Sequence, residues 1–159
     1  MFEHKKYNGT QEQNYALLQM QLVALLEGKN NLITDLANAA ALLNQFLPAI
    51  NWVGFYLYHE GDLILGPFQG LPACTRIPLG KGVCGAAALA KQTLYVEDVS
   101  RYPDHIACDA ATKSELVIPL IKNNALIAVL DIDSPITHRF DPFEIEQLEN
   151  YVRQLISSL

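Results

Sequence analysis

Two apolar segments joined by a short polar turn constrain the fold of this chain more than any other feature. They occupy residues 116–121 and 125–133, and the turn between them is Lys122-Asn123-Asn124. Strand-forming residues dominate both segments. Parallel strands need a connection of about a dozen residues or more, so these two segments are expected to pair as antiparallel strands. The sequence therefore predicts a β-hairpin in its last third.

Helical and strand-like patterns elsewhere complete the expected order of elements. Thr10 and Gln13 fit a capping box at the start of a first helix, and Asp141 with Pro142 fits the start of the last one. Apolar residues recur at helical spacing after both starts. We expect helices near residues 10–28, 32–46, 86–91 and 141–156, and further strands at residues 51–58, 63–66, 76–79 and 94–96.

The connections between these elements indicate the fold class. Pro67, Gly70 and Pro72 predict an irregular stretch, and residues 97–114 form a long polar segment of the kind that often carries function. Hairpin-like connections favour an α+β domain, with a mainly antiparallel sheet and terminal helices packed on one face. Because no linker interrupts the chain, we expect one domain over residues 1–159.

Two acids project together from the second hairpin strand. Side chains alternate along a strand, so Ile127, Val129, Asp131 and Asp133 are expected on one face. A single aspartate at a strand end is commonly just solvated. Two neighbouring acids repel each other, and this calls for a cationic partner or a shared proton.

Glu115 opens the preceding strand, and its position depends on the hairpin's register. A two-residue turn at Asn123 and Asn124 would place Glu115 opposite Ile132, on the other face of the sheet. A bulge at Pro119, or a three-residue loop, would bring Glu115 level with one of the two aspartates. We therefore predict an irregular hairpin that gathers three acids.

Composition excludes several classes of function. The chain carries 11 Lys and Arg against 17 Asp and Glu, a formal net charge of −6, which argues against nucleic acid as the main partner. No apolar run approaches the roughly 20 residues that span a bilayer. The N-terminal residues lack the apolar core of a signal peptide, so we expect a cytoplasmic protein.

The three cysteines, Cys74, Cys84 and Cys108, indicate redox chemistry. An odd count without a secretion signal does not fit a disulfide framework. Idle buried thiols remain an alternative, since cores accept free cysteine. None of the three, however, lies in the middle of a long apolar run. His105, three residues before Cys108, either lowers the pKa of that thiol or lies on the surface of the loop.

Three further patterns have both a structural and a functional interpretation. Trp52 and Tyr56 share one strand face, as core aromatics or as the wall of a pocket. Residues 80–85 match G-x-G-x-x-G, but no βαβ unit surrounds them, which argues against a dinucleotide site. We expect a tight turn and a close backbone approach here, with amides that can stabilise an anion such as a substrate carboxylate or a Cys84 thiolate. No closely spaced pair of metal ligands occurs, so we expect no zinc.

Five motifs, taken with the cysteine positions, resemble one family. They are NWVGFYL, LGPFQG, IPLGKGVCG, HIACDAATKSELVIPL and LDIDSP. In this order they are similar to the free methionine-(R)-sulfoxide reductases, enzymes built on a GAF domain. The likeness runs from about Tyr15 to the final helix. It implies a GAF-like α+β domain whose six-stranded antiparallel sheet is flanked by N- and C-terminal helices.

The resemblance also implies a reaction and a set of site residues. The reaction is the reduction of free methionine-(R)-sulfoxide, with thioredoxin as reductant and no cofactor or metal. Cys108 would attack the sulfoxide sulfur, and Cys84 and Cys74 would resolve the product. The substrate-binding residues would be Trp52, Tyr56, Glu115, Asp131 and Asp133. Which cysteine forms the first disulfide, and which acid holds the proton, stay open.

The chemistry of these residue types agrees with that implication. A sulfoxide oxygen leaves poorly without a proton, and crowded carboxylates raise one another's pKa until one stays protonated near neutrality. The remaining acids can bind the α-ammonium group of a free amino acid. Oxygen transfer leaves a sulfenic acid, which a second thiol converts to a disulfide and an external dithiol reduces.

Two other functions fit parts of the sequence. A GAF module that only binds a small molecule needs the acidic pocket but no cysteines. A thiol-based oxidant sensor needs reactive cysteines but no enclosed acidic pocket. The chain offers both features, which favours the enzyme. Apolar positions in the first helix also offer a surface for a homodimer.

Overall fold

The computed structural model describes residues 3, 6–28, 31–106 and 108–159; the N-terminal residues behind the signal-peptide expectation lie partly outside this range. No helix in the described part is long and apolar enough to span a bilayer. The helices are α1 (Gln11–Leu26), α2 (Leu32–Phe46), α3 (Gly82–Ala90), the 3-10 helix η1 (Val99–Arg101) and α4 (Pro142–Ser158). The strands are β1 (Trp52–His59), β2 (Asp62–Gly70), β3 (Arg76–Pro78), β4 (Leu94–Val96), β5 (Ser114–Lys122) and β6 (Ala125–Ser134).

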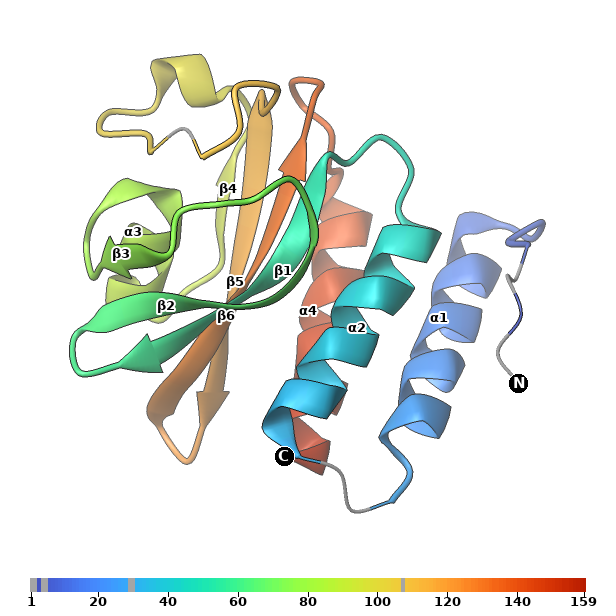
Figure 1. Cartoon of the computed structure of the whole chain (residues 1–159). Coiled ribbons are helices and arrows are strands. Elements are labelled where there is room, and N and C mark those ends of the chain that lie inside the picture. Colours follow the sequence, from blue (N-terminus) through green and yellow to red (C-terminus); the bar gives the residue numbers. More distant parts are fainter. Residues whose placement is uncertain (1–2, 4–5, 29–30, 107) are drawn as a thin grey trace.

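The strands that the structure describes form one six-stranded sheet in the order β3-β2-β1-β6-β5-β4 (Figure 1). Every pairing is antiparallel. The edge strands β3 and β4 have three residues each, and such short edges leave little backbone for pairing with another chain. The predicted α+β class and antiparallel sheet are confirmed.

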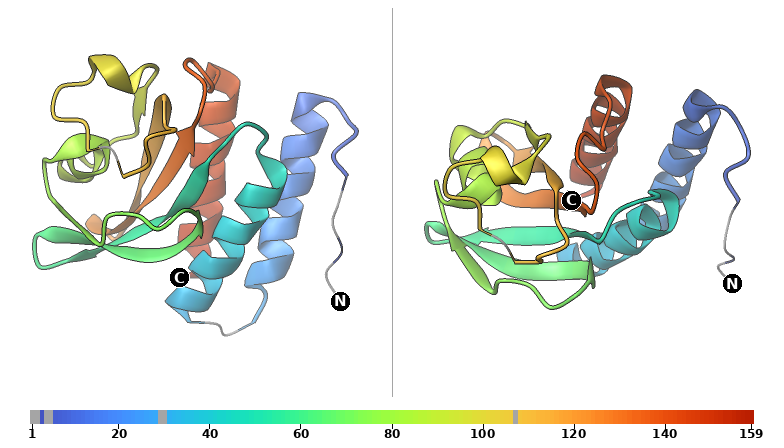
Figure 2. Two further views of the ribbon diagram at one scale, coloured as in Figure 1. Left: turned by 45° about the horizontal axis from the view of Figure 1, so that its top comes forward. Right: turned by 90° about the horizontal axis from the view of Figure 1, so that it is seen from above.

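The helices divide unequally between the two faces of the sheet. Figures 1 and 2 show α2 and α4 on one face, with α1 packed outside them as a further layer. The opposite face carries α3 and the long segment between β4 and β5. Each face has its own apolar core, because alternate residues of the same strands point to opposite sides.

The helix-side core contains the larger cluster of buried residues, among them Leu18, Leu36, Leu43, Leu130, Leu148 and Tyr151. The opposite core is smaller, and it includes Trp52, Tyr56, Val83, Cys84, Val117 and Val129. The smaller core shares its side of the sheet with the polar groups of the candidate site. Packing of the three long helices is therefore separated from the site by the sheet itself.

The predicted starts of α1 and α4 are confirmed. Thr10 Oγ1 accepts from the Gln13 N–H at 3.2 Å, and Gln13 Oε1 accepts from the Thr10 N–H at 3.0 Å, which completes the capping box. Asp141 caps α4 by accepting from the Glu144 N–H at 2.8 Å, and Pro142 occupies the first helical turn. Side chains near each start thus satisfy N–H groups that have no partner within the helix.

The expectation of an irregular stretch after residue 66 is wrong for residues 67–70. β2 continues through Pro67 to its last residue, and its register with β1 shifts on the way. Gly54 pairs with Phe68 whereas Tyr56 pairs with Leu65, so β2 carries an extra residue at this point. Proline is tolerated at such a bulge because the regular ladder is already interrupted there.

The glycine-rich segment forms the beginning of α3. The predicted helix start at residue 86 is therefore wrong, because the first helical residue is Gly82. Gly80 and Gly82 have φ values of 80° and 60°, which favour glycine. A Cβ atom at Gly85 would lie 2.5 Å from the carbonyl oxygen of Pro78. The expected tight turn and close backbone approach are confirmed.

The β5–β6 hairpin turns at Asn123 and Asn124. Both residues are left-handed, with φ values of 50° and 64°. Two consecutive left-handed residues are typical of the type I′ turn, whose twist matches that of paired strands, and asparagine tolerates this conformation well. The predicted turn is confirmed in its two-residue form.

The predicted irregularity in this hairpin is also present, but it is not at Pro119. The register shifts between Leu120 and Ile121, and the residue of β6 left without a partner is Ile127. One extra residue reverses the alternation of side chains on one side of the bulge. Ile127 therefore packs on the helix-side core while Val129 lies in the opposite core, and their expected common face is wrong.

Candidate active site

Three carboxylates from β5 and β6 lie on the sheet face that carries α3. Glu115 on β5 pairs with Asp133 on β6, and Asp131 lies two residues before it on the same face. The exposed fractions of Glu115, Asp131 and Asp133 are 6%, 6% and 9%. The bulge supplies the register that the sequence required. The predicted gathering of the three acids is confirmed.

Burial changes the protonation of this cluster. It raises the pKa of Asp131 and of Asp133 well above the usual range for aspartate, and the negative charge of Glu115 raises both further. Asp131 Oδ1 is buried and accepts no hydrogen bond from the described residues. Burial therefore favours the protonated form of these acids, so the cluster can hold a proton at higher pH than exposed carboxyl groups can.

His105 is the neighbour of Glu115. Its Nε2 atom lies 3.3 Å from Glu115 Oε2, and the exposed fraction of its side chain is 14%. The interpretation of His105 as a surface residue is therefore wrong. When protonated, the imidazole supplies positive charge directly beside the acids. The other interpretation, that His105 tunes the thiol of Cys108, stays a prediction.

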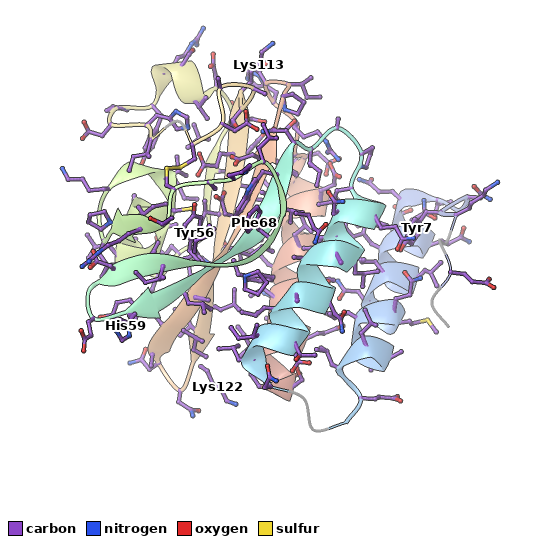
Figure 3. The ribbon with its side chains drawn as sticks, in the orientation of Figure 1. Tyr7, Tyr56, His59, Phe68, Lys113 and Lys122 are labelled. Atoms are coloured by element: carbon purple, nitrogen blue, oxygen red, sulfur yellow. A yellow bond between two sulfur atoms is a disulfide. The ribbon has the colours of Figure 1, made fainter. Side chains whose placement is uncertain are left out.

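Cys74 and Cys108 form a disulfide, with their Cα atoms 5.6 Å apart (yellow bond in Figure 3). Cys74 lies between β2 and β3, and Cys108 lies in the long segment between β4 and β5. Tyr56 Oη donates to the carbonyl oxygen of Cys74 at 3.0 Å. The bond therefore ties the segment that covers the site to a part of the chain that Tyr56 holds in place.

Cys84 stays a free thiol in the first turn of α3. Its exposed fraction is 3%, and its Sγ atom lies 3.9 Å from Glu115 Oε1. Burial raises the pKa of Cys84 well above its usual value, and the charges of the nearby carboxylates raise it further. Both effects favour the neutral thiol over the thiolate. The expectation that the helix start stabilises a Cys84 thiolate is wrong.

Aromatic rings form the side of the site next to the acids. Trp52 and Tyr56 stack with centroids 5.9 Å apart, and Phe68 stacks on Trp52 at 5.2 Å. Figure 3 labels Tyr56 and Phe68. The indole Nε1 donates to the carbonyl oxygen of Leu71 at 3.1 Å. A Cβ at Gly54 would lie 2.7 Å from the indole Cη2, so glycine is required beneath this stack.

Asp109 anchors the covering segment, which is the stretch between β4 and β5 (described residues 97–106 and 108–113), beside the disulfide. It accepts from Asn51 Nδ2 at 2.9 Å and from the Ala111 N–H at 2.8 Å. These hydrogen bonds hold the pKa of Asp109 below its usual range, because they favour the charged form. The position next to Cys108 suggested no such anchoring role, although an aspartate that binds a nearby backbone N–H is a common turn signal.

A cavity of about 20 Å³ lies between these groups, with a second of about 10 Å³ beside it. Tyr56, Cys108, Asp131 and Asp133 line both. A buried water needs roughly 10–15 Å³ of such space, so the disulfide-bridged form has room for about one water molecule. A ligand as large as an amino acid can enter only when the segment that carries His105 and Cys108 moves.

Comparison with known proteins identifies the family. The GAF domain family matches residues 31–159. The free methionine-R-sulfoxide reductase of Escherichia coli is 48% identical over 145 residues, which cover 91% of this chain and 86% of that protein. The chain belongs to the free methionine-R-sulfoxide reductase family of GAF-domain proteins.

Solved structures of this family have the same fold. The structure of fRMsr from Staphylococcus aureus in its reduced form superposes with a TM-score of 0.90 and 50% identity, covering 98% of this chain and 99% of that one. The free methionine-R-sulfoxide reductase of Neisseria meningitidis in complex with its substrate gives a TM-score of 0.90 at 36% identity, covering 98% and 95%. The expected GAF-like fold is confirmed.

The residues singled out in the sequence meet at one place in this family member. The predicted side chains that border the two cavities are Trp52, Tyr56, Cys84, Cys108, Glu115, Asp131 and Asp133. Cys74 reaches the same place through the disulfide. The sequence did not indicate Phe68, because its segment was expected to be irregular. Nor did it indicate that His105 would contact Glu115.

Proposed function

We propose that this chain, acting as one GAF domain over residues 1–159, reduces free L-methionine-(R)-sulfoxide to methionine. One observation carries the proposal: Cys108, which forms a disulfide with Cys74, lines the same cavity as the buried acids. A sulfur able to form a disulfide, beside carboxyl groups that hold a proton, combines a nucleophile with an acid catalyst.

The acids and the aromatic rings divide the recognition of the substrate. One of Glu115, Asp131 and Asp133 holds the proton, and the other two, as carboxylates, bind the α-ammonium group of the substrate, since charged hydrogen bonds are the strongest available there. Trp52 and Tyr56 pack against the apolar part of the side chain. A methionine sulfoxide within a peptide has no free ammonium group, which explains a preference for the free amino acid.

Reduction takes place in one oxygen transfer. The Cys108 sulfur attacks the sulfoxide sulfur, and a buried carboxyl group protonates the sulfoxide oxygen. The resulting hydroxyl group moves from the methionine sulfur to the Cys108 sulfur while the transient bond between the two sulfurs breaks. Methionine leaves in its reduced form, and Cys108 becomes a sulfenic acid. The raised pKa of Asp131 and Asp133 supports the presence of a proton donor near neutrality.

A second thiol then removes the oxygen from Cys108. The Cys74 thiol attacks the sulfenic sulfur, water leaves, and the disulfide forms. Cys84 is the remaining partner, and its buried thiol makes it the slower one to resolve the sulfenic acid. Thioredoxin restores both thiols by dithiol exchange in the cytoplasm, where such reductants are abundant.

A coupled assay tests the proposal directly. The protein is combined with thioredoxin, thioredoxin reductase and NADPH, and free R- and S-sulfoxides are compared. We expect turnover of the R form, no turnover of the S form, and complete loss of turnover in Cys108→Ser. Wild-type rates in Cys108→Ser would refute the assigned nucleophile. Turnover of neither sulfoxide by the wild type would favour a binding module without catalysis.

The α1 helix supports a further proposal, that two copies of the chain associate. Met20 and Val23 on α1 are 69% and 50% exposed, and exposed apolar side chains on one helix favour an interface. Sedimentation equilibrium checks the stoichiometry. Met20→Glu should convert a dimer to a monomer, whereas Ile136→Glu, at an exposed apolar position outside α1, should not. A monomeric wild type would contradict the proposal.

A further inference from the structure

Three side chains from three elements meet as a group of metal-ligand type. Cys84 comes from α3, Glu115 from β5 and Asp131 from β6, and all three are buried. Their ligand atoms, one sulfur and two carboxylate oxygens, lie within 4.8 Å of one another. The hairpin pattern predicted that Glu115 and Asp131 would lie together, but the sequence did not indicate that Cys84, which lies on a different element, would join them.

Asp131 provides an independent sign that the group accepts a ligand. Its Oδ1 atom is buried, and no described residue donates a hydrogen bond to it. A buried carboxylate oxygen without a donor is costly, so a cation or a donor at this point would stabilise the site. The Cys84 thiol has a single proton, so it cannot donate hydrogen bonds to both Glu115 and Asp131 at the same time.

The donor set selects the class of cation. Thiolate and carboxylate together suit Zn²⁺ and related divalent transition metals, whereas Mg²⁺ and Ca²⁺ prefer oxygen alone. His105 Nε2 contacts the second oxygen of Glu115 at 3.3 Å, which leaves the first oxygen directed toward Cys84. Such outer contacts orient a metal ligand without binding the metal.

We propose that Cys84, Glu115 and Asp131 form a binding site for a divalent metal ion of the zinc class. Three protein ligands leave a fourth position open to water or a small solute. On binding, the thiol of Cys84 loses its proton to solvent and a metal–sulfur bond forms, so metal affinity rises with pH. The ion would occupy carboxylates that the proposed function assigns to the substrate ammonium group, so the two ligands would compete.

Cobalt(II) is the probe that tests this site without any measurement of turnover. The chain has three cysteines, and in the disulfide-bridged protein only Cys84 is a free thiol. Cobalt added to this oxidised protein should therefore give a thiolate-to-cobalt absorption band that titrates to one ion per chain. Added zinc should remove the band. Absence of the band at saturating cobalt would overturn the proposal.

Variants assign the ligands. Cys84→Ser should abolish the band, with Cys84→Ala as a second variant should serine disturb folding, and circular dichroism confirms the fold of each. Asp131→Asn and Glu115→Gln should each weaken cobalt binding strongly, and His105→Gln should weaken it by about 10–100-fold. The matched control is Glu60→Gln, an exposed glutamate in the β1–β2 turn, which should change nothing.

Two results would contradict the assignment. A band that persists in Cys84→Ser and Cys84→Ala would come from another group, and cobalt affinity unchanged in both Asp131→Asn and Glu115→Gln would exclude the carboxylates. Neither readout depends on the reductase reaction. Failure of the proposed function would leave these spectra unchanged, so the two hypotheses are separated.

Discussion

At the scale of a single residue, Tyr56 connects the aromatic wall of the site to the segment that carries Cys74. Its ring stacks on Trp52, and its hydroxyl group holds the carbonyl of Cys74 at 3.0 Å. The same side chain therefore borders the cavity and fixes the segment that carries one half of the disulfide. The partner of Cys108 is held by a buried side chain and not by a loop alone.

This placement gives a prediction for Cys74. In Cys74→Ser the first oxygen transfer should still occur, so one methionine per chain should form in a single turnover. Steady-state turnover with thioredoxin should fall at least about tenfold, because the Cys108 sulfenic acid has lost its partner. Rapid-quench sampling with chromatographic detection of methionine measures the first, and NADPH consumption the second.

The matched control is Cys84→Ser, which leaves the disulfide pair intact. Its steady-state rate should exceed that of Cys74→Ser. If the two variants ranked in the opposite order, Cys84 and not Cys74 would be the principal resolving cysteine.

At the scale of elements, the β5–β6 hairpin holds its turn, which contributes to stability, apart from the acids of the candidate site. Its turn and the acid cluster lie toward opposite ends of the strands, as the labelled Lys122 and Lys113 indicate in Figure 3. The backbone of Asn124 is left-handed, with φ at 64°. A β-branched residue is strained in this conformation, whereas glycine adopts it freely.

Asn124→Val should therefore destabilise the protein by about 1–2 kcal/mol, the cost of a left-handed residue that resists this conformation. Urea unfolding in one redox state measures the loss. Asn124→Gly is the matched control and should cost little or nothing. kcat/KM should stay at the wild-type value in both variants. Equal destabilisation by valine and glycine would show that the turn conformation is not the cause.

Local patterns predicted most elements, because their causes are local. The capping box at Thr10, the Asn123-Asn124 turn and the acidic face of β6 depend on residues that are close in sequence. The bulge at Ile127 has no such signal, since any apolar residue fits there. Only the need to align Glu115 with the aspartates indicated that an irregularity existed.

The missed features depend on contacts between distant segments. Phe68 reaches Trp52 because β2 continues past Pro67 through a bulge, which the proline had suggested was a break. The contact between His105 and Glu115 depends on how the covering segment folds back over the sheet. Neither the spacing nor the type of these residues predicts how their segments run across the sheet.

At the scale of the whole molecule, the sheet separates a stabilising layer from a reactive one. Figure 2 shows the three long helices on one side, and α3 with the covering segment on the other. The apolar core under α2 and α4 contains most of the buried side chains. The three buried acids of the site, including Asp131 with its unpartnered Oδ1 atom, lie on the face opposite this larger core.

The buried acids make stability depend on pH. Folding raises the pKa of Asp131 and Asp133, so the folded state binds more protons than the unfolded state once pH exceeds the unfolded value of about 3.9. The free energy of unfolding should therefore fall as pH rises from that value through the raised pKa. Each unit of pKa difference is worth about 1.4 kcal/mol.

Asp133→Asn should remove part of this cost. We expect the variant to match the wild type near pH 4 and to be more stable by about 1 kcal/mol or more at pH 8. Urea unfolding of the disulfide-bridged protein at both pH values measures the difference. Asp104→Asn, at an exposed position, is the matched control and should give no pH-dependent gain. A larger loss of stability in Asp133→Asn at pH 8 than at pH 4 would contradict this account.

The closed cavity of the bridged form has a consequence for the order of events in the reaction. With space for about one water molecule beside a sulfur already bonded to Cys74, the oxidised chain is shut to a second sulfoxide. It is equally shielded from progress to sulfinic acid, the irreversible stage of thiol damage. The disulfide thus limits each chain to one oxygen transfer and protects its reactive sulfur from further oxidation. An external dithiol must reduce the bond before the chain can react again.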